Sequence, residues 1–202
     1  MKYKICVSGA AVTDHCAPDA MEKTKELGRE IVRQGSVLTT GATIGVPLWA
    51  AIGTKEEGGF SIGLSPAYSE IEHVKKYKLP TDYFDIIIYT GFGYSGRNLF
   101  LTRASDAVIT VCGRIGTLNE FTIAFEDRKP IGILTDTGGI ADEIEEIVEE
   151  CKRPNSKIVY DSDPKKLVSK LIDLIKKEKE EARPDIPSDI QDHSPGKKIK
   201  DQ

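Results

Sequence analysis

The 202-residue sequence lacks long apolar runs, so no segment approaches the length that a bilayer-spanning helix needs. Its N-terminus, MKYKICVSGA, leads directly into a predicted strand and has no small-residue cleavage site after an apolar core. We therefore expect no signal peptide and no membrane association, and we predict a cytoplasmic protein.

Metal-ligand and disulfide motifs are also absent. The four cysteines are far apart and form no Cys-x-x-Cys pair, and the three histidines form no ligand motif: Cys6, Cys16, Cys112 and Cys151; His15, His73 and His193. This spacing favours reduced thiols in a cytoplasm over a disulfide framework or a zinc site. We expect no metal site.

An excess of basic residues is missing as well. The chain has 28 Lys and Arg against 32 Asp and Glu, a net charge of −4 and a pI near 5.5. That balance argues against a protein that binds nucleic acid through its phosphate backbone. Any bound anion must be held locally, by a loop and a few arginines. The hydrophobic fraction of 39% is ordinary for a soluble globular protein.

Short apolar runs alternate with amphipathic segments along most of the chain. We predict strands at 4–8, 37–40, 60–64, 84–89, 107–111, 131–134 and 157–160, and helices near 18–34, 46–57, 96–105, 117–128, 140–151 and 164–180. This alternation predicts an α/β fold: a doubly wound, mostly parallel sheet of modified Rossmann type with helices on both faces. Residues 1–180 should form one nucleotide-binding domain, and the charged, proline-bearing residues 181–202 should form a disordered tail.

Three turns rich in small residues follow predicted strands: Ser8-Gly9-Ala10, Thr39-Thr40-Gly41-Ala42, and Gly113 to Thr117. In a doubly wound sheet, ligands bind at the carboxyl ends of the strands, where the strand order reverses. Free N–H groups and the helix dipole make the turn at 113–117 an anion cradle. We predict nucleotide or phosphate contacts from Gly9, Gly41, Gly113, Arg114, Gly116 and Thr117.

Arg97 and Glu120 are the candidate reactive side chains. Arg97 follows several glycines at the sheet edge, where a guanidinium can bind a phosphate. Glu120 lies in the predicted helix after the cradle. The alternatives are structural: an ion pair of Arg97 with Asp106 or Asp82, and a glycine turn needed only for its geometry. Arg103 is a further candidate for anion contact.

Cys112 precedes a helix N-terminus, where a thiol can act as a nucleophile. The simpler interpretation of Cys112 is a small residue that ends a strand.

The pattern Arg97…Ser105-Asp106-Ala107…Gly113-x-x-Gly116-Thr117-x-x-Glu120 resembles the LONELY GUY family of cytokinin-activating phosphoribohydrolases. That family carries an arginine, then Ser-Asp-Ala, then Pro-Gly-Gly-x-Gly-Thr-x-x-Glu at the same separation. The segment TGFGYSGRN is most similar to a bacterial subgroup that includes molybdenum-cofactor carrier proteins. The resemblance covers most of residues 4–150, and its specific part lies between Gly91 and Glu120.

The resemblance implies that Arg97 and Glu120 cleave the N-glycosidic bond of a nucleoside 5′-monophosphate, while the turn from Gly113 to Thr117 holds the 5′-phosphate. It also implies a homodimer that needs no cofactor. The chain departs from the family pattern where Arg114 replaces the second glycine of the cradle and Asn119 replaces an acid. These departures motivate a second hypothesis, a non-catalytic carrier or sensor of a nucleotide or pterin-type cofactor. A third hypothesis is a transferase with Cys112 as its nucleophile.

Overall fold

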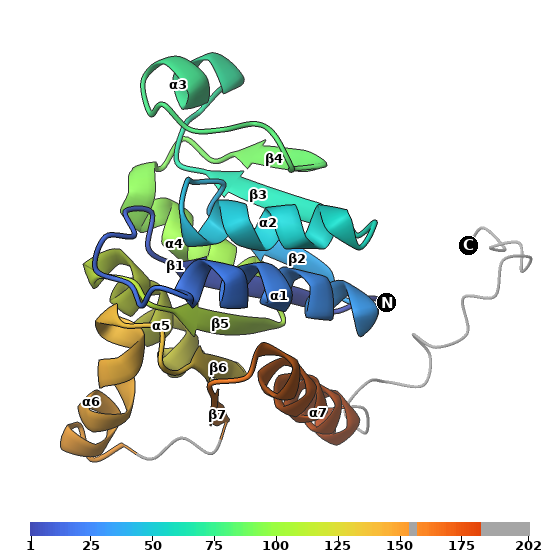
Figure 1. The fold of residues 1–202 in the computed structure, drawn as a ribbon, viewed down its shortest axis with the longest axis vertical. Helices are drawn as coiled ribbons and strands as arrows, with labels where there is room; N and C mark the ends of the chain where they lie inside the picture. Colours follow the sequence, from blue (N-terminus) through green and yellow to red (C-terminus); the bar gives the residue numbers. More distant parts are fainter. Residues whose placement is uncertain (154–156, 183–202) are drawn as a thin grey trace, which may run out of the picture.

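The computed structural model describes residues 1–153 and 157–182 and shows an α/β fold with one parallel sheet of seven strands. Helices alternate with the strands along the chain (Figure 1). The elements are β1 (Lys4–Gly9), α1 (Ala20–Arg33), β2 (Val37–Thr40), α2 (Val46–Glu56), β3 (Ser61–Ser65), α3 (Glu70–Lys75), β4 (Ile86–Tyr89), α4 (Gly93–Ala104), β5 (Ala107–Val111), α5 (Ile115–Glu126), β6 (Ile131–Leu134), the 3₁₀ helix η1 (Gly139–Glu143), α6 (Ile144–Glu150), β7 (Ile158–Asp161) and α7 (Pro164–Ala182).

The strand order is β4-β3-β2-β1-β5-β6-β7, which places the reversal of order between β1 and β5. In Figure 1 the strands follow this order from β4 near the top to β7 near the bottom. Gly9, the last residue of β1, pairs with Val111, the last residue of β5. The loops that leave these two strands therefore start side by side, which is where doubly wound sheets bind ligands.

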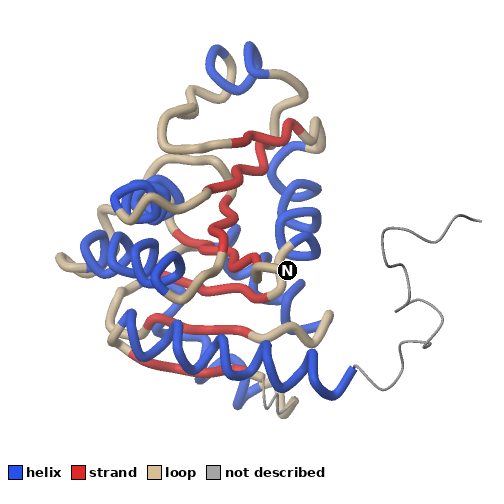
Figure 2. The backbone as a smooth tube through the Cα atoms, turned by 90° about the vertical axis from the view of Figure 1, so that its right-hand side faces the viewer, coloured by secondary structure: helices blue, strands red, loops and turns tan. Residues whose placement is uncertain are grey.

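Helices cover both faces of the sheet, as the turned view in Figure 2 shows. One apolar core packs α1, α2 and α7 against the sheet, through residues such as Leu27, Ala50 and Leu171. The other packs α4, α5 and α6 on the opposite face, through Leu101, Phe121 and Ile144. All five residues of β5 are buried, as expected of a central parallel strand covered on both faces.

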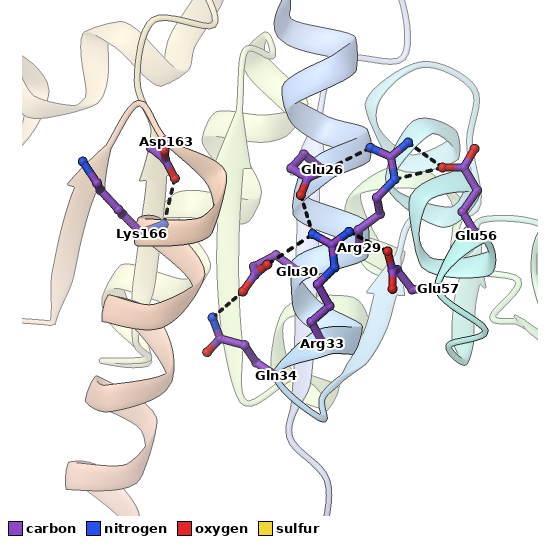
Figure 3. A network of polar contacts seen from close by, with 9 residues as sticks. All are labelled: Glu26, Arg29, Glu30, Arg33, Gln34, Glu56, Glu57, Asp163 and Lys166. Atoms are coloured by element: carbon purple, nitrogen blue, oxygen red, sulfur yellow. Dashed lines mark hydrogen bonds and ion pairs between the residues drawn. The ribbon is translucent and has the colours of Figure 1, made fainter.

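Charged side chains join α1 to the end of α2, as Figure 3 shows. Arg29 donates to Glu26 and Glu56, while Arg33 donates to Glu26 and Glu57. These side chains are partly exposed to solvent, so each ion pair adds little to the stability of the packing between α1 and α2.

The predicted start of the last helix at residue 164 is confirmed, because α7 begins at Pro164. The Asp163 carboxylate accepts a hydrogen bond from the Lys166 backbone N–H at 3.0 Å (Figure 3). This is the N-cap contact that the sequence indicates.

Asp106 lies at the edge of the sheet opposite the carboxyl ends of the strands, where its carboxylate connects β1 with α7. Burial disfavours its charged form, but hydrogen bonds from Lys179 and Lys4 outweigh burial and lower the pKa of Asp106 to about 2. A carboxyl whose pKa is lower in the folded state contributes stability above its unfolded pKa and loses it as pH falls towards 2. We expect Asp106→Asn to cost about 1–2 kcal/mol at pH 7 and to flatten the stability profile between about pH 4 and 2. Urea unfolding across pH measures both effects, and an unchanged acid limb would contradict this role.

Two details differ from the sequence prediction. Helix α3 was not predicted, because its six residues, EIEHVK, expose both Ile71 and Val74 and so show no buried stripe. Its start is fixed locally by Ser69, whose hydroxyl accepts from the Glu72 N–H at 3.2 Å. The helix predicted at 140–151 is divided into η1 and α6. Most of the tail predicted at 181–202 lies outside the described residues.

Within residues 1–153 and 157–182, no helix is both long enough and apolar enough to cross a bilayer.

Candidate functional site

A cleft of about 260 Å³ opens at the carboxyl end of the sheet, at the reversal between β1 and β5. Its volume lies slightly below the range for small-molecule sites, roughly 300–1,000 Å³. Its walls come from the loop after β1, the loop after β2, and helices α4 and α5: Gly9, Ala10, Ala11, Val12, Thr43, Tyr94, Arg97, Asn98, Arg114, Gly116, Thr117 and Glu120.

Arg97 and Glu120 form a buried ion pair on the wall of this cleft. Arg97 Nη1 donates to Glu120 Oε1 at 2.9 Å, and the two side chains are only 7% and 8% exposed. The second carboxylate oxygen, Oε2, accepts a hydrogen bond from the Ser8 hydroxyl at the end of β1. The structural alternative that paired Arg97 with Asp106 or Asp82 is wrong, because the partner of Arg97 is Glu120.

Burial raises the pKa of Glu120, against the opposing effects of Arg97 and the Ser8 hydroxyl. A carboxyl group in such surroundings is a candidate for chemistry, since perturbed pKa values gather at functional sites. Arg97 Nε is buried and has no hydrogen-bond partner within the described part of the chain. The pair therefore places a carboxyl group and a guanidinium on the wall of one cleft, and the guanidinium keeps one buried donor without a partner.

Gly41 provides the space for the Arg97 guanidinium. A Cβ at position 41 would lie 2.2 Å from Arg97 Nη1, so any side chain there would displace the arginine. Gly9 is packed as tightly, because its Cβ would lie 2.4 Å from Val46 Cγ1 and 2.5 Å from the Val111 carbonyl oxygen. Of these two predicted nucleotide-binding glycines, Gly9 lines the cleft, whereas Gly41 lies behind the arginine.

The predicted cradle is the turn between β5 and α5. Gly113 has a φ of +89° and its Cβ would lie 2.4 Å from Thr117 Oγ1, so glycine is needed there for both reasons. Gly113 supports the turn without lining the cleft, whereas Arg114, Gly116 and Thr117 line it. Gly116 and Thr117 lie in the first turn of α5, where backbone N–H groups have no helical partner and favour an anion.

Arg114 occupies the N-cap position of α5 and reaches toward the loop after β1. Its Nη2 donates to Asp14 Oδ1 at 2.8 Å, and its Nε donates to His15 Nδ1 at 3.2 Å. Arg103, the other arginine considered for anion contact, pairs instead with Asp127 and does not line the cleft.

The prediction of reduced thiols is wrong for two of the four cysteines. Cys16, in the loop after β1, forms a disulfide with Cys112 at the start of the cradle. Sequence reasoning missed this bond because 96 positions separate the two residues and only the tertiary fold brings them together. The bond also overturns the interpretation of Cys112 as a nucleophile or a plain strand end.

His15 lies beside the Cys16–Cys112 bond, although we expected no ligand cluster of histidine and cysteine. One ring nitrogen and both sulfurs lie within 4.8 Å of one another. Its Nε2 is 3.3 Å from the Gly113 carbonyl oxygen.

Sequence reasoning also missed Tyr94, Asn98 and Thr43, which line the cleft. Tyr94 and Asn98 flank Arg97 on α4, and the arginine lies over the Tyr94 ring at 5.9 Å. The Asn98 amide nitrogen donates to Asn119 Oδ1 at 3.0 Å in one orientation of the amide, and to Glu120 Oε1 at 2.9 Å in the swapped orientation. The available signal was helical spacing: Tyr94 lies three positions before Arg97, and Asn98 lies four positions after Tyr94.

Gly116 offers a test of the cradle, because a Cβ there meets no protein atom within 4 Å. We expect Gly116→Ala to leave stability unchanged or raise it by up to about 1 kcal/mol, since alanine favours a helix over glycine. The methyl group at the cleft wall should weaken binding of adenosine 5′-monophosphate about tenfold or more, measured by calorimetry. Thr122→Ala, exposed on the same helix, is the matched control. Equal affinity in the two variants would contradict a ligand at Gly116.

Comparisons with known proteins show the family to which this chain belongs. The family model described as the SLOG cluster4 family matches residues 2–168. The chain belongs to this family. An uncharacterised protein from Archaeoglobus fulgidus is 30% identical over 131 residues, which cover 65% of this chain and 81% of the relative.

Two solved structures of molybdenum cofactor proteins are also similar to this chain. The molybdenum cofactor binding protein from Rippkaea orientalis is 31% identical with a TM-score of 0.69, covering 88% of this chain and 98% of that one. The molybdenum cofactor carrier protein of Chlamydomonas reinhardtii is 27% identical with a TM-score of 0.69, covering 87% and 99% of the two chains. The predicted resemblance and the predicted Rossmann-type fold are thereby confirmed.

Proposed function

We propose that this member of the SLOG cluster4 family binds a nucleoside 5′-monophosphate and hydrolyses its N-glycosidic bond. The observation that carries the proposal is the buried Arg97–Glu120 pair, which shares one cleft with the N-terminus of α5. A phosphate accepted by the first turn of α5 would leave the ribose beside Glu120, which lies further along the same helix.

The chemistry follows from this placement. The bond between C1′ and the base nitrogen breaks, and the ribose passes through an oxocarbenium-like state. The Glu120 carboxylate stabilises the positive charge and orients a water molecule. The water oxygen bonds to C1′, and a proton from that water goes to the departing base, which yields free base and ribose 5-phosphate. Arg97 would turn from Glu120 toward ligand oxygens, including through its unpaired Nε.

A non-catalytic carrier or sensor is the second candidate function. Two observations favour it: solved relatives are described as a molybdenum cofactor binding protein and a carrier protein, and Arg114 stands at the cradle where the resembled enzymes have glycine. The same cradle would accept a pterin-type cofactor that carries a phosphate group. In this case the Arg97–Glu120 pair would hold the ligand without cleaving it.

Incubation with adenosine 5′-monophosphate, other 5′-monophosphates and isopentenyl derivatives separates the two functions. The hydrolase predicts that free base appears on chromatography. The carrier predicts that an intact ligand raises the melting temperature of both the wild-type and the Glu120→Gln protein, and that no base appears. Absence of base from every substrate, where an active phosphoribohydrolase succeeds, would contradict hydrolysis.

We also propose a homodimer. Large apolar side chains are exposed around the β4 edge of the sheet: Ile71, Ile86, Ile88, Phe92, Leu99 and Phe100. Phe92 and Phe100 stack at 5.1 Å, and an apolar surface of this kind favours a second subunit. Light scattering should give twice the chain mass, and Phe100→Asp should give the monomer. A wild-type monomer would contradict the dimer.

The cytoplasmic location and the absence of nucleic-acid partners stay part of this proposal. The absence of nucleic-acid partners rests on the net charge of −4 and on a ligand site that is local to one cleft, and the cytoplasmic location stays a prediction from the sequence.

A further inference from the structure

The Cys16–Cys112 disulfide joins the two walls of the candidate ligand cleft. On one side, the loop between β1 and α1 begins with Ala10, Ala11 and Val12, which line the cleft, and continues to Cys16. On the other side, Cys112 begins the turn that leads into α5, and Arg114, Gly116 and Thr117 after it line the opposite wall. The bond is therefore the covalent link between the β1 loop and the cradle.

The other links between these two walls near the bond are weaker. Arg114 pairs with Asp14, but the two side chains are 57% and 74% exposed, so the pair is largely screened by solvent. His15 Nε2 contacts the Gly113 carbonyl oxygen at 3.3 Å, a long hydrogen bond. The loop is also anchored further away, where the Ala17 N–H donates to the Thr137 carbonyl at 2.9 Å. Loss of the disulfide would leave residues 11–16 held mainly by these contacts.

The cradle side of the bond is fixed by its own backbone contacts, so the disulfide joins the β1 loop to a rigid wall. Cys112 has a φ of +47°, a left-handed conformation that non-glycine residues rarely adopt. It is completely buried, its N–H donates to Thr137 Oγ1 at 2.9 Å, and its carbonyl accepts from the Ala141 N–H at 2.9 Å. A backbone fixed in this way presents the first turn of α5 to a ligand without further ordering, which favours binding.

We propose that the Cys16–Cys112 disulfide is a reversible redox control of ligand binding in this cleft, with tight binding in the oxidised form and weaker binding in the reduced form. The ligand is a phosphate-bearing small molecule, so the inference rests on the binding part of the proposed function and not on hydrolysis. Because linkage is reciprocal, a bound ligand also protects the disulfide from reduction.

The reductant is a dithiol, and the exchange balances in two steps. One of its thiolates attacks Sγ of Cys16, the less buried of the two residues, and forms a mixed disulfide as the bond to Cys112 breaks. The electron pair and then a proton go to Cys112 Sγ, whose position just before α5 favours the leaving thiolate. The second thiol of the reductant then attacks the mixed disulfide, which releases Cys16 as a thiol and the reductant as its disulfide.

The test compares the full chain in air-oxidised form and after treatment with dithiothreitol, with EDTA present so that no metal binds the freed thiols and His15. Calorimetry with adenosine 5′-monophosphate and with inorganic phosphate gives the Kd values. We expect reduction to raise the Kd at least about fivefold. Cys16→Ser should show the reduced-form Kd with or without dithiothreitol. Cys151→Ser, which changes an exposed free cysteine, should behave as the wild type.

Three results would overturn the inference: four free thiols in the air-oxidised protein, equal Kd values in the two forms, or no binding of either probe to either form. If Cys16→Ser fails to fold, the oxidised and reduced wild type still decide. Binding of adenosine 5′-monophosphate without release of adenine contradicts the proposed hydrolysis but leaves this comparison intact, so the two failures are distinguishable.

Discussion

Glu120→Gln should abolish release of base from a nucleoside 5′-monophosphate while leaving the nucleotide bound. The amide keeps the size of the side chain and can still accept from Arg97, but it cannot offer a full negative charge to an oxocarbenium-like ribose. Loss of one electrostatic or acid–base group of this kind lowers kcat about 10²- to 10⁴-fold. Single-turnover assays of free base give kcat, and calorimetry gives the Kd, which should change less than about threefold.

Glu126→Gln is the matched control for this substitution. Glu126 is exposed at the end of the same helix and pairs with Arg153, away from the cleft. It should retain wild-type kcat. If Glu120→Gln also retained wild-type kcat, the carboxylate would have no role in bond cleavage.

The raised pKa of Glu120 also predicts how kcat should change at acid pH. Burial raises the pKa of Glu120, so its ionised form is lost at a higher pH than that of an exposed glutamate. Because the ionised form is the one that stabilises positive charge, kcat should fall as pH decreases through this raised pKa. A profile whose acid limb lies at the pKa of an ordinary glutamate, about 4.3, would contradict the assignment.

Arg97→Met should be the most destabilising substitution in the site. It leaves the buried Glu120 carboxylate without its cation, and breaking a buried ion pair by removing one partner costs about 3–5 kcal/mol. Without Arg97, burial alone raises the pKa of Glu120 further above its unfolded value. The loss should therefore be largest above the raised folded-state pKa of Glu120 in the variant, and it should shrink as pH falls through that pKa and the buried carboxyl takes up a proton.

Arg103→Met on the same helix provides the comparison, because Arg103 is 61% exposed and pairs with Asp127 at the surface. Its cost should stay below about 1 kcal/mol. Urea unfolding at pH 7 and pH 5 measures both variants. The double variant Arg97→Met with Glu120→Gln should recover part of the lost stability, since no buried charge remains. Equal costs for Arg97→Met and Arg103→Met would refute the energetic role of the buried pair.

Redox control of the disulfide would make the measured ligand affinity depend on whether the buffer is oxidising or reducing. If the disulfide governs affinity, activity assays in reducing buffer would underestimate the binding of the oxidised protein. The substitutions above should therefore be compared in one redox state, and the thiol content of each sample should be determined.

The sequence alone was sufficient to predict the alternation of strands and helices, the parallel sheet and the three small-residue turns. These follow from local patterns: apolar runs of strand length, helical stripes and Asp163 before Pro164, which together select this architecture with few alternatives. The spacing from Arg97 to Glu120 also belongs to a single short segment. Its resemblance to a known family could therefore be seen without a structure.

Tertiary structure decided what those residues touch. Ser8 reaches Glu120 across 112 positions, and Cys16 reaches Cys112 across 96. Both contacts arise because β1 and β5 are neighbours in the sheet although they are distant in the chain. Gly41 follows β2, which pairs with the other side of β1, and there it provides the space for the Arg97 guanidinium. A sequence pattern records which side chains follow one another, whereas strand order determines which loops share an edge, and that order created both the cleft and the disulfide across it.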